Sequence, residues 1–417
     1  MTTSRERVRQ TLDFVQPDRV PVDFGGHRSS GIMAMAYSRL RHYLGLSKRP
    51  LRILDMILQL AVVDEDVLDR FGIDTIDLSA AFHTEPDRWN PWVLPDGTEC
   101  FIPDYINLAR EGDTWLLLAA DGIPLGVQKP GMIYFEQLDY PMRQDPAGTV
   151  DRVEEMLAHD LWSAIGAPPG PLPMTEASHA YLAERARRLR ERTSRYIITG
   201  VRGPLFEGGQ HLFGMDNFYV MLASEPDLAH RFLDNLTEAY LRRLEFTLTA
   251  VGPYIDMVIV FDDFGMQTGL QISPRMYRTF FKPRQKRLWS RIKELAPGVR
   301  IQLHSCGSMA ELLPDMAEVG LDAWNPVQIS AHNMAPERLK PEFGRTVAFW
   351  GGGCDTQYML KDGTPAEIRA HVRHNLDVFA PGGGYVFTQV HNIMADVPPQ
   401  NIVAMFDAVA DWRGTHG

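Results

Sequence analysis

Short runs of apolar and β-branched residues recur along the chain, and longer segments with apolar residues at spacings of three and four separate most of them. The short runs have the length of β-strands, whereas the longer segments have the period of amphipathic α-helices. The predicted strands cover residues 19–24, 73–78, 196–201, 256–261, 300–303, 323–325, 346–350 and 385–388. Strands that alternate with helices are typical of a parallel α/β sheet, and eight of them favour a closed (β/α)8 TIM barrel over an open doubly wound sheet.

The helical pattern predicts elements between these strands and before them. In the first half, helices are expected from Ser4 to a point before Pro17, and over residues 32–44, 57–71 and 175–192. In the second half they are expected over residues 226–250, 274–295, 308–318 and 365–378, some with proline in the first turn. No G-x-G-x-x-G follows the first strand and no Walker A motif occurs, so the nucleotide-binding open-sheet folds lack their signatures.

Residues 86–141 interrupt the alternation of strands and helices. Trp, Tyr and Thr are frequent in this segment, and turn signals such as Pro95-Asp-Gly97 and Ala120-Asp-Gly122 recur. We therefore predict a β-meander inserted into a barrel that also has N-terminal helices. Residues 1–417 are interpreted as a single domain.

The composition is that of an ordinary globular protein, with 45% hydrophobic and 23% charged residues among 417. A formal net charge of -11 argues against nucleic acid or an anionic membrane surface as the principal partner. Charged residues stand where a secretory signal would need an apolar core, and the longest apolar runs are too short to span a bilayer. Three cysteines do not form a disulfide framework, so we expect a cytoplasmic protein.

Two of the predicted strands end in residues that bind soft metal ions. His304 and Cys306 follow the strand at 300–303, and Cys354 follows three glycines after the strand at 346–350. Side chains two positions apart on a strand point to the same face, so His304 and Cys306 can share one ion. With Cys354 as the third donor, the set matches a catalytic zinc site that keeps a fourth position open.

A histidine near a cysteine is more often part of a buried core than of a metal site. Here two of the three cysteines lie at glycine-flanked strand ends, which favours the metal interpretation. Cys100 has no such setting, and we expect it in the core.

In a (β/α)8 barrel the active site lies at the C-terminal ends of the strands, and polar residues follow nearly all the predicted strands. Asp262 and Asp263 are adjacent, so at most one of them is expected to face the site. Glu207 and Asp263 are candidates for a displaceable fourth metal ligand or for an acid, although Glu207 is equally compatible with a surface loop.

His391 is as consistent with ordering its loop as with a chemical role, and Arg28 fits either a bound carboxylate or a solvated charge. The other strand-end residues predicted to bind or orient the substrate are His27, Asn325 and Gln328, and Arg202 also follows a strand.

Five segments carry a family resemblance: Asp18-Arg-Val-Pro-Val-Asp-Phe-Gly-Gly, Phe261-Asp-Asp-Phe-Gly-Met-Gln-Thr-Gly, Ile272-Ser-Pro-Arg-Met-Tyr-Arg, His304-Ser-Cys306-Gly and His391-Asn-Ile-Met-Ala-Asp-Val-Pro-Pro-Gln-Asn. Together they are similar to the uroporphyrinogen decarboxylase superfamily, and specifically to its zinc-dependent branch of methylcobamide:coenzyme M methyltransferases and O-demethylases. That branch has an H-x-C pair followed by a distant Cys, which His304, Cys306 and Cys354 match.

This resemblance implies a (β/α)8 barrel enzyme that moves a methyl group to or from cobalamin, with zinc as the metal. The methyl donor or acceptor would be a small methylated compound, such as a methoxylated one, or a thiol. The cobalamin is expected on a separate corrinoid protein, since no D-x-H-x-x-G segment occurs here. Barrels of this family are often homodimers, so a homodimer is the corresponding expectation.

Two alternatives stay open at this level. A metal-free decarboxylase of the same superfamily would use Asp262 or Asp263 as the polar centre that steadies developing charge. However, those decarboxylases resemble one another in an arginine-rich N-terminal loop, whereas residues 25–30 offer only Arg28. The other alternative is a non-catalytic subunit that binds a corrinoid protein or serves as a scaffold, and whose zinc would be structural.

Overall fold

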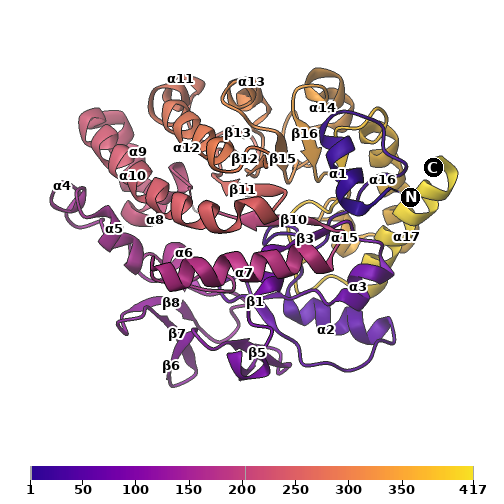
Figure 1. The fold of residues 1–417 in the computed structure, drawn as a ribbon, viewed down its shortest axis with the longest axis horizontal. Helices are drawn as coiled ribbons and strands as arrows, with labels where there is room; N and C mark the ends of the chain where they lie inside the picture. The colour runs from indigo at the N-terminus through magenta and orange to yellow at the C-terminus, as the bar shows by residue number, and fades with distance from the viewer. Residues whose placement is uncertain (1, 202, 417) are drawn as a thin grey trace.

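Seven parallel β-strands form the central sheet of the computed structural model, which describes residues 2–201 and 203–416 (Figure 1). Each strand pairs with the next one in the order β3-β10-β11-β14-β15-β16-β17. Their bounds are Thr75–Asp77, Tyr196–Gly200, Met257–Phe261, Arg300–His304, Ala323–Asn325, Ala348–Trp350 and Tyr385–Val386. Each of these strands overlaps one that the sequence pattern predicts.

The segment predicted as the first strand closes the sheet into a barrel. Val22 forms an isolated parallel bridge with Phe387, which follows β17, and the Asp23 N–H donates a 2.8 Å hydrogen bond to the Phe387 carbonyl. On its other side, the Val22 carbonyl accepts a 2.8 Å hydrogen bond from the N–H of Asp74, just before β3. Pro21 has no N–H to donate, which shortens the ladder here. The eight positions together form the predicted (β/α)8 barrel.

Long helices surround the strands, and three predicted ones are confirmed to within a residue or two: α7 (Glu176–Arg192), α10 (Pro226–Val251) and α16 (Pro365–Phe379). The helix predicted over 32–44 is α2 (Ala34–Tyr43). The helix predicted over 274–295 is divided into α11 (Pro274–Met276), a π-helical turn (Tyr277–Phe281) and α12 (Lys282–Leu295). The last helix, α17 (Pro399–His416), was not predicted and packs against α16 and α2.

The helix predicted over residues 57–71 is present only near its end, as α3 (Glu65–Arg70). Before it, the chain forms a hairpin of β1 (Ile53–Asp55) and β2 (Leu60–Ala61). Backbone partners from distant segments override the helical pattern, because the Phe101 N–H donates to the Leu51 carbonyl and the Phe135 N–H to the Ile57 carbonyl. These bonds tie the hairpin to the inserted segment, and no local pattern reveals them.

Two helices that the pattern does not predict, α8 (Phe206–Phe213) and α9 (Met215–Ser224), follow β10. α8 contains Gly208 and Gly209, and glycine has a low helix propensity. A Cβ on Gly209 would lie 2.3 Å from the Phe218 ring, so the close packing of α8 on α9 requires glycine at this position.

The inserted segment contains two antiparallel sheets. β4 (Trp89–Val93) pairs with β5 (Glu99–Pro103), which carries the buried Cys100. A four-stranded meander follows, formed by β6 (Asn107–Glu111), β7 (Thr114–Leu118), β8 (Pro124–Gln128) and β9 (Glu136–Gln137). The short helices α4 (Pro146–Thr149), α5 (Val153–Met156) and α6 (Leu161–Ala164) then lead to α7.

The first helix, α1 (Ser4–Leu12), closes the N-terminal end of the barrel. Val8 and Leu12 pack against the residues that fill the barrel interior, among them Tyr196 and Trp350. Because this end is filled by a helix, the C-terminal ends of the strands are the end at which a site can form.

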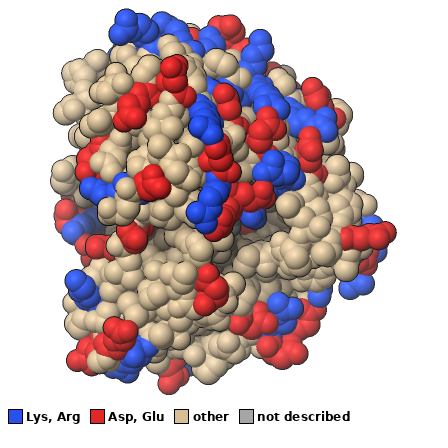
Figure 2. Space-filling view, turned by 90° about the vertical axis from the view of Figure 1, so that its left-hand side faces the viewer, with Lys and Arg blue, Asp and Glu red and all other residues tan. Residues whose placement is uncertain are grey.

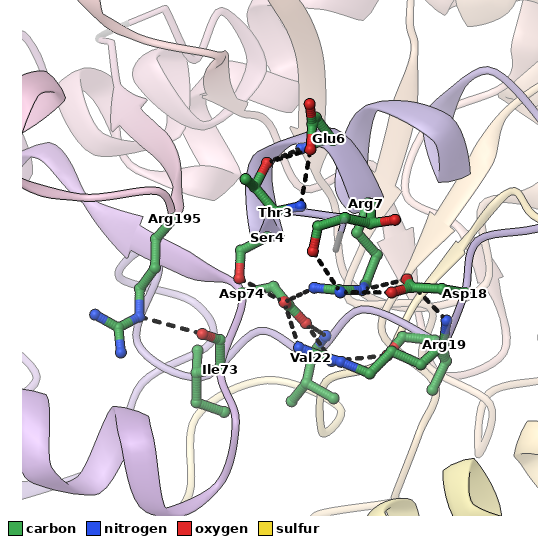
Figure 3. Close-up of polar contacts among 12 residues, drawn as sticks. Thr3, Ser4, Glu6, Arg7, Asp18, Arg19, Val22, Ile73, Asp74 and Arg195 are labelled. Carbon is green, nitrogen blue, oxygen red and sulfur yellow. Dashed lines mark hydrogen bonds and ion pairs between the residues drawn. The ribbon is translucent and has the colours of Figure 1, made fainter. Parts of the chain in front are cut away.

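Buried charge holds α1 in place (Figure 3). Asp74 accepts hydrogen bonds of 2.8 Å from the Ser4 hydroxyl and from the Arg7 guanidinium. The N-cap of the helix is Thr3, which forms a capping box with Glu6.

The remaining short elements are β12 (Gly265–Met266), β13 (Gly269–Leu270), α13 (Leu313–Glu318), α14 (Pro336–Phe343) and α15 (Met359–Asp362). The helix predicted over 308–318 is therefore α-helical only in its second half, after a 3-10 turn at Ala310–Leu312. None of the described helices is both long and apolar enough to cross a bilayer.

Candidate active site

β14 and the turn after it place a histidine and a cysteine side by side. His304 ends β14, and its Nε2 lies 3.5 Å from the Sγ of Cys306. The turn depends on Gly307, whose φ of 76° favours glycine, and a Cβ there would lie 2.5 Å from the carbonyl carbon of Gly265. The Cys306 N–H donates a 2.8 Å hydrogen bond to Asp263 Oδ1, which ties this turn to the end of β11.

The His304 ring is held in one orientation from behind. Its Nδ1 lies 2.6 Å from the Oδ1 of Asn325, and the side-chain amide of Asn325 donates a 2.9 Å hydrogen bond to the Trp350 carbonyl. The Asn325 oxygen must therefore accept from His304, which places the imidazole proton on Nδ1 and leaves the Nε2 lone pair free. Burial lowers the pKa of His304 to about 3, so the ring is neutral near pH 7.

His391 approaches this pair from the loop after β17. The ligand atoms of His304, Cys306 and His391 all lie within 4.8 Å of one another, a spacing that one metal ion can bridge. His391 has a φ of 64°, which is uncommon for a residue with a Cβ, and its Nδ1 accepts a 2.8 Å hydrogen bond from the Asn392 N–H. This bond leaves the ring proton on Nε2, so binding a metal through Nε2 would require that proton to move and the Asn392 bond to be given up. Burial lowers the pKa of His391.

Cys354, the third ligand predicted from the sequence, lies outside this group. Its side chain is fully buried in the hydrophobic core, and its Sγ lies 3.7 Å from the Asp355 carbonyl oxygen. Gly351 and Gly352 have φ values of 133° and 67°, so the chain turns after β16 and the alternation of side chains does not extend to position 354. The structure brings a different side chain, that of His391, next to the H-x-C pair.

The two adjacent aspartates at the end of β11 have separate partners. The Asp262 carboxylate accepts backbone hydrogen bonds of 3.1, 2.8 and 3.0 Å from Leu205, Phe206 and Glu207, at the start of α8. Burial raises the pKa of Asp262 to about 7. Asp263 instead lines the cavity, where its Oδ1 lies 3.9 Å from the Nε2 of His304.

Glu207, in the first turn of α8, can hold a proton beside this group. Its Oε2 accepts a 3.1 Å hydrogen bond from the Asp263 N–H. Burial raises the pKa of Glu207 well above its usual range, and the nearby charge of Asp263 raises the pKa further. A raised pKa favours the protonated form of Glu207, which is the form that an acid catalyst needs.

Two of the residues predicted to bind substrate line the cavity. His27 is buried, and its Nε2 lies 3.3 Å from the Oδ2 of Asp23. Arg28 forms an ion pair of 2.6 Å with Asp55 and lies over the Trp162 ring, 5.5 Å from its centroid. Arg28 therefore already has a counter-ion, unlike a solvated loop charge.

Asn325 and Gln328 were predicted to orient the substrate, and the structure places both behind the candidate ligands instead. Asn325 is fully buried against the imidazole described above. The Gln328 Oε1 accepts a 2.8 Å hydrogen bond from the Gly307 N–H. The Gln328 Nε2 donates a 2.8 Å hydrogen bond to the Oε1 of Gln267. Both side chains therefore position the end of β14. Arg202, which the sequence also places at a strand end, lies outside the described residues.

A cavity of about 500 Å³ extends from these side chains, within the size range of small-molecule sites. One wall is aromatic: Trp162 and His211 stack with centroids 5.6 Å apart and rings 19° from parallel, and Phe82 and Phe261 also line it. Arg243 of α10 contributes to another wall. Figure 2, which views the molecule from the side of α8 and α10, shows a hollow in the middle of that face. Trp162, His211 and Arg243 could not be predicted from the sequence, because they lie within helices and no motif or strand end marks them.

Comparison with known proteins places this chain in a family. Residues 167–412 match the family model described as Uroporphyrinogen decarboxylase (URO-D). A uroporphyrinogen decarboxylase from Alkalilimnicola ehrlichii is 26% identical over 261 residues, which cover 60% of this chain and 67% of that protein. Another from Psychromonas ingrahamii is 29% identical over 195 residues, which cover 45% of this chain and 50% of that protein.

One solved structure is similar over the whole length. A methyltransferase from Methanosarcina mazei has a TM-score of 0.58 with this chain, at 17% sequence identity and with 99% of both chains covered. At that identity the likeness concerns the fold. The match to the family model covers more than half of the 417 residues, and the chain therefore belongs to the uroporphyrinogen decarboxylase (URO-D) family.

Proposed function

We propose that this protein is a zinc-dependent methyltransferase that moves a methyl group between a small methylated compound, such as a methoxylated one, and the cobalamin of a separate corrinoid protein. One observation carries the proposal. The ligand atoms of His304, Cys306 and His391 meet within 4.8 Å at the open end of the barrel, beside the carboxyl group of Asp263. The full-length fold likeness to a methyltransferase agrees with it.

The donor atoms fit zinc. Thiolate and imidazole are the ligands of catalytic zinc sites, which use three protein donors and leave one position open. The tautomer of His304 presents a free Nε2 lone pair toward the Sγ of Cys306, as a ligand requires. The third donor is either His391, which lies beside this pair, or Cys354, which the family pattern indicates. Zinc bound here would supply a Lewis acid that stabilises negative charge on the oxygen or sulfur atom that exchanges the methyl group.

The chain's own residues supply proton transfer and positioning. When a methyl–oxygen bond breaks, the electron pair stays on the oxygen, and protonated Glu207 is placed to neutralise it. Asp263 holds the backbone of Cys306, and Asn325 holds the ring of His304, so neither candidate ligand must reorient during turnover. The aromatic wall presents few polar groups to the reacting atoms.

A metal-free decarboxylase is the second candidate, and the names of the similar proteins favour it. A substrate with many carboxylates needs several cations that face the cavity. Among the described residues that line it, the arginines are Arg28 and Arg243, and Arg28 is already paired with Asp55. This lack of positive charge favours methyl transfer over decarboxylation of such a substrate.

Zinc analysis of purified protein tests the proposal. We expect about one zinc per chain in the wild type and in Cys100→Ala, whose thiol is buried on β5, and loss of zinc in Cys306→Ala. The variants His391→Ala and Cys354→Ala identify the third ligand, because only the one that removes a donor loses zinc.

The activity assay uses the same set of proteins. The wild type should methylate cob(I)alamin from a panel of methoxylated compounds, and Cys306→Ala should not. A wild type that holds no zinc after careful preparation, or that turns over uroporphyrinogen without metal, would contradict methyl transfer and support the decarboxylase.

A further inference from the structure

The hairpin of β12 and β13 lies directly against the turn that carries Cys306. A Cβ on Gly265 would lie 2.4 Å from the Cys306 carbonyl oxygen, and a Cβ on Gly307 would lie 2.7 Å from the Met266 nitrogen. The Ser308 N–H also donates a 2.8 Å hydrogen bond to the Met266 carbonyl. The hairpin and the turn are therefore in backbone contact, so a displacement of one displaces the other.

Three successive N–H groups of this turn are bound from outside it. The Cys306 N–H donates to Asp263, and the Ser308 N–H donates to the hairpin. The Gly307 N–H donates a 2.8 Å hydrogen bond to the Oε1 of Gln328, in the loop after β15. The position of Cys306 thus depends on where the Gln328 side chain is held.

Gln267, on the hairpin, holds the Gln328 side chain. The Gln267 Oε1 accepts a 2.8 Å hydrogen bond from the Gln328 Nε2, and the Gln267 Nε2 donates a 2.6 Å hydrogen bond to the Ser330 carbonyl. The Gln267 carbonyl also accepts a 2.8 Å hydrogen bond from the His332 N–H. Gln267 is exposed, yet both ends of its amide are bound by protein atoms. It therefore fastens the hairpin to the loop after β15.

We propose that Gln267 is a positioning residue for Cys306, which acts through Gln328 and the Gly307 N–H to fix the direction of the thiol. The effect on the thiol rests on the hydrogen bonds above, and the effect on zinc rests on the proposed function. A ligand whose direction is fixed beforehand binds metal more tightly, because less order must be created on binding. Zinc in the site would in turn make the hairpin more rigid, because coupling between two sites is reciprocal.

Alkylation of the metal-free protein provides the first test. Cys100 and Cys354 are buried and Cys306 is only partly buried, so the reaction of Cys306 with iodoacetamide can be followed by mass spectrometry at one pH. Gln267→Met keeps the length of the side chain but neither hydrogen bond, and we expect it to raise the alkylation rate about three- to tenfold. Gln267→Glu keeps an acceptor for Gln328 and should restore part of the wild-type protection.

The matched control is Gln357→Met. Gln357 is also an exposed glutamine, and its Oε1 accepts a 2.9 Å hydrogen bond from the Ser330 hydroxyl. Because this bond does not involve Gln328 or Gly307, the control should react at the wild-type rate.

Zinc binding provides the second test. Competition with a chromophoric chelator should give a zinc affinity about three- to tenfold lower for Gln267→Met than for the wild type and Gln357→Met. Hydrogen exchange measured by mass spectrometry should show that zinc slows exchange of residues 265–271 in the wild type, and slows it less in Gln267→Met. Neither measurement requires methyl transfer.

Equal alkylation rates for metal-free wild type and Gln267→Met would overturn the positioning role, and so would an equal increase in Gln357→Met. If the wild type binds no zinc but Gln267→Met still raises the alkylation rate, the proposed function fails and the positioning role stands. If the wild type binds zinc and methylates cob(I)alamin, and Gln267→Met does so with unchanged zinc affinity, the positioning role fails and the proposed function stands. Circular dichroism and thermal melting of each variant show that the fold is retained.

Discussion

The Nδ1 of His304 lies 2.6 Å from the Oδ1 of Asn325, and the two residues are direct neighbours in the pairing of β14 with β15. The amide of Asn325 donates to the Trp350 carbonyl on the next strand, so its oxygen has a fixed direction. Three adjacent strands thereby set the tautomer of one imidazole. Asn325 is a positioning residue: its side chain is fully buried, so it acts on His304 rather than on the substrate.

Replacing Asn325 with Ala should weaken zinc binding by about 10- to 100-fold, as is typical when the partner of a histidine ligand is lost. The His304 ring would then lack the acceptor that keeps its proton on Nδ1. Zinc affinity is measured by competition with a chromophoric chelator. Asn401→Ala is a matched control, because Asn401 is also a buried asparagine whose amide donates to backbone carbonyls, those of Leu360 and Gly363. Zinc affinity that falls equally in both variants would indicate general loosening rather than control of the tautomer.

The pH dependence of ether cleavage should report the proton on Glu207. Burial and the nearby Asp263 raise its pKa above the usual range, so the acid form is present below that pKa and is lost as the pH rises through it. We expect kcat/KM to be level at lower pH and to fall on the alkaline side. In Glu207→Gln this alkaline limb should disappear and the rate should drop about 10²- to 10⁴-fold.

The leaving group provides the control for this prediction. A methyl ether whose phenol is strongly acidic needs little proton donation, so Glu207→Gln should slow it much less than an alkyl ether. Equal losses for both ethers would mean that Glu207 acts in binding rather than as an acid.

Replacing Gly307 with Ala should distort the turn that carries Cys306. The residue has a φ of 76°, and the new Cβ would lie 2.5 Å from the Gly265 carbonyl carbon and 2.6 Å from the Met266 oxygen. Backbone strain of this kind costs about 1–3 kcal/mol. The turn, and Cys306 with it, would have to move to relieve this strain. The zinc content per chain should decrease, and so should the free energy of unfolding measured in urea. Gly298→Ala, where a Cβ would meet no atom within 4 Å, should change neither.

Replacing Asp74 with Asn should destabilise the closed end of the barrel. This fully buried carboxylate accepts hydrogen bonds from Ser4, Arg7, Arg19 and the Val22 N–H (Figure 3). Removing one partner of a buried ion pair typically costs about 3–5 kcal/mol, measured here as the free energy of unfolding in urea.

The control for this variant is Asp69→Asn. Asp69 pairs with Arg195 on the same side of the barrel, but its side chain is 73% exposed. A surface pair of this kind contributes at most about 1 kcal/mol. If Asp74→Asn and Asp69→Asn lowered the free energy of unfolding by similar amounts, burial would not explain the contribution of Asp74.

The barrel itself could be predicted from the sequence, because its strands are short buried runs whose apolar pattern is local. β11 and β15 are examples, and their predicted and observed bounds agree to within one residue. The region 57–71 could not be predicted, because its hairpin depends on hydrogen bonds to Phe101 and Phe135, far along the chain. Local periodicity contains no information about such partners.

Some residues of the candidate site could likewise be predicted from the sequence, and others could not. His304 and Cys306 were predictable because strand alternation fixes their relative direction over two residues. Cys354 follows glycines that turn the chain, so its direction could not be read from the strand, and the proximity of His391 depends on a left-handed residue in a loop. Arg243 was not predicted to line the cavity, because a helical arginine is ordinarily solvated.

Residues near both ends of the chain form the seam of the barrel. Val22 bridges Phe387, and the Gly31 N–H binds the Asn392 side chain across 361 positions of sequence. While the chain is being synthesised, the early half of this seam cannot pair until residues 387–392 have emerged from the ribosome. The H-x-C pair can already stand at the end of an open sheet, but His27 and His391 reach the cavity only when the seam closes. A chain in which this seam has not closed would thus carry the Cys306 thiol without the pocket that surrounds it in the folded protein.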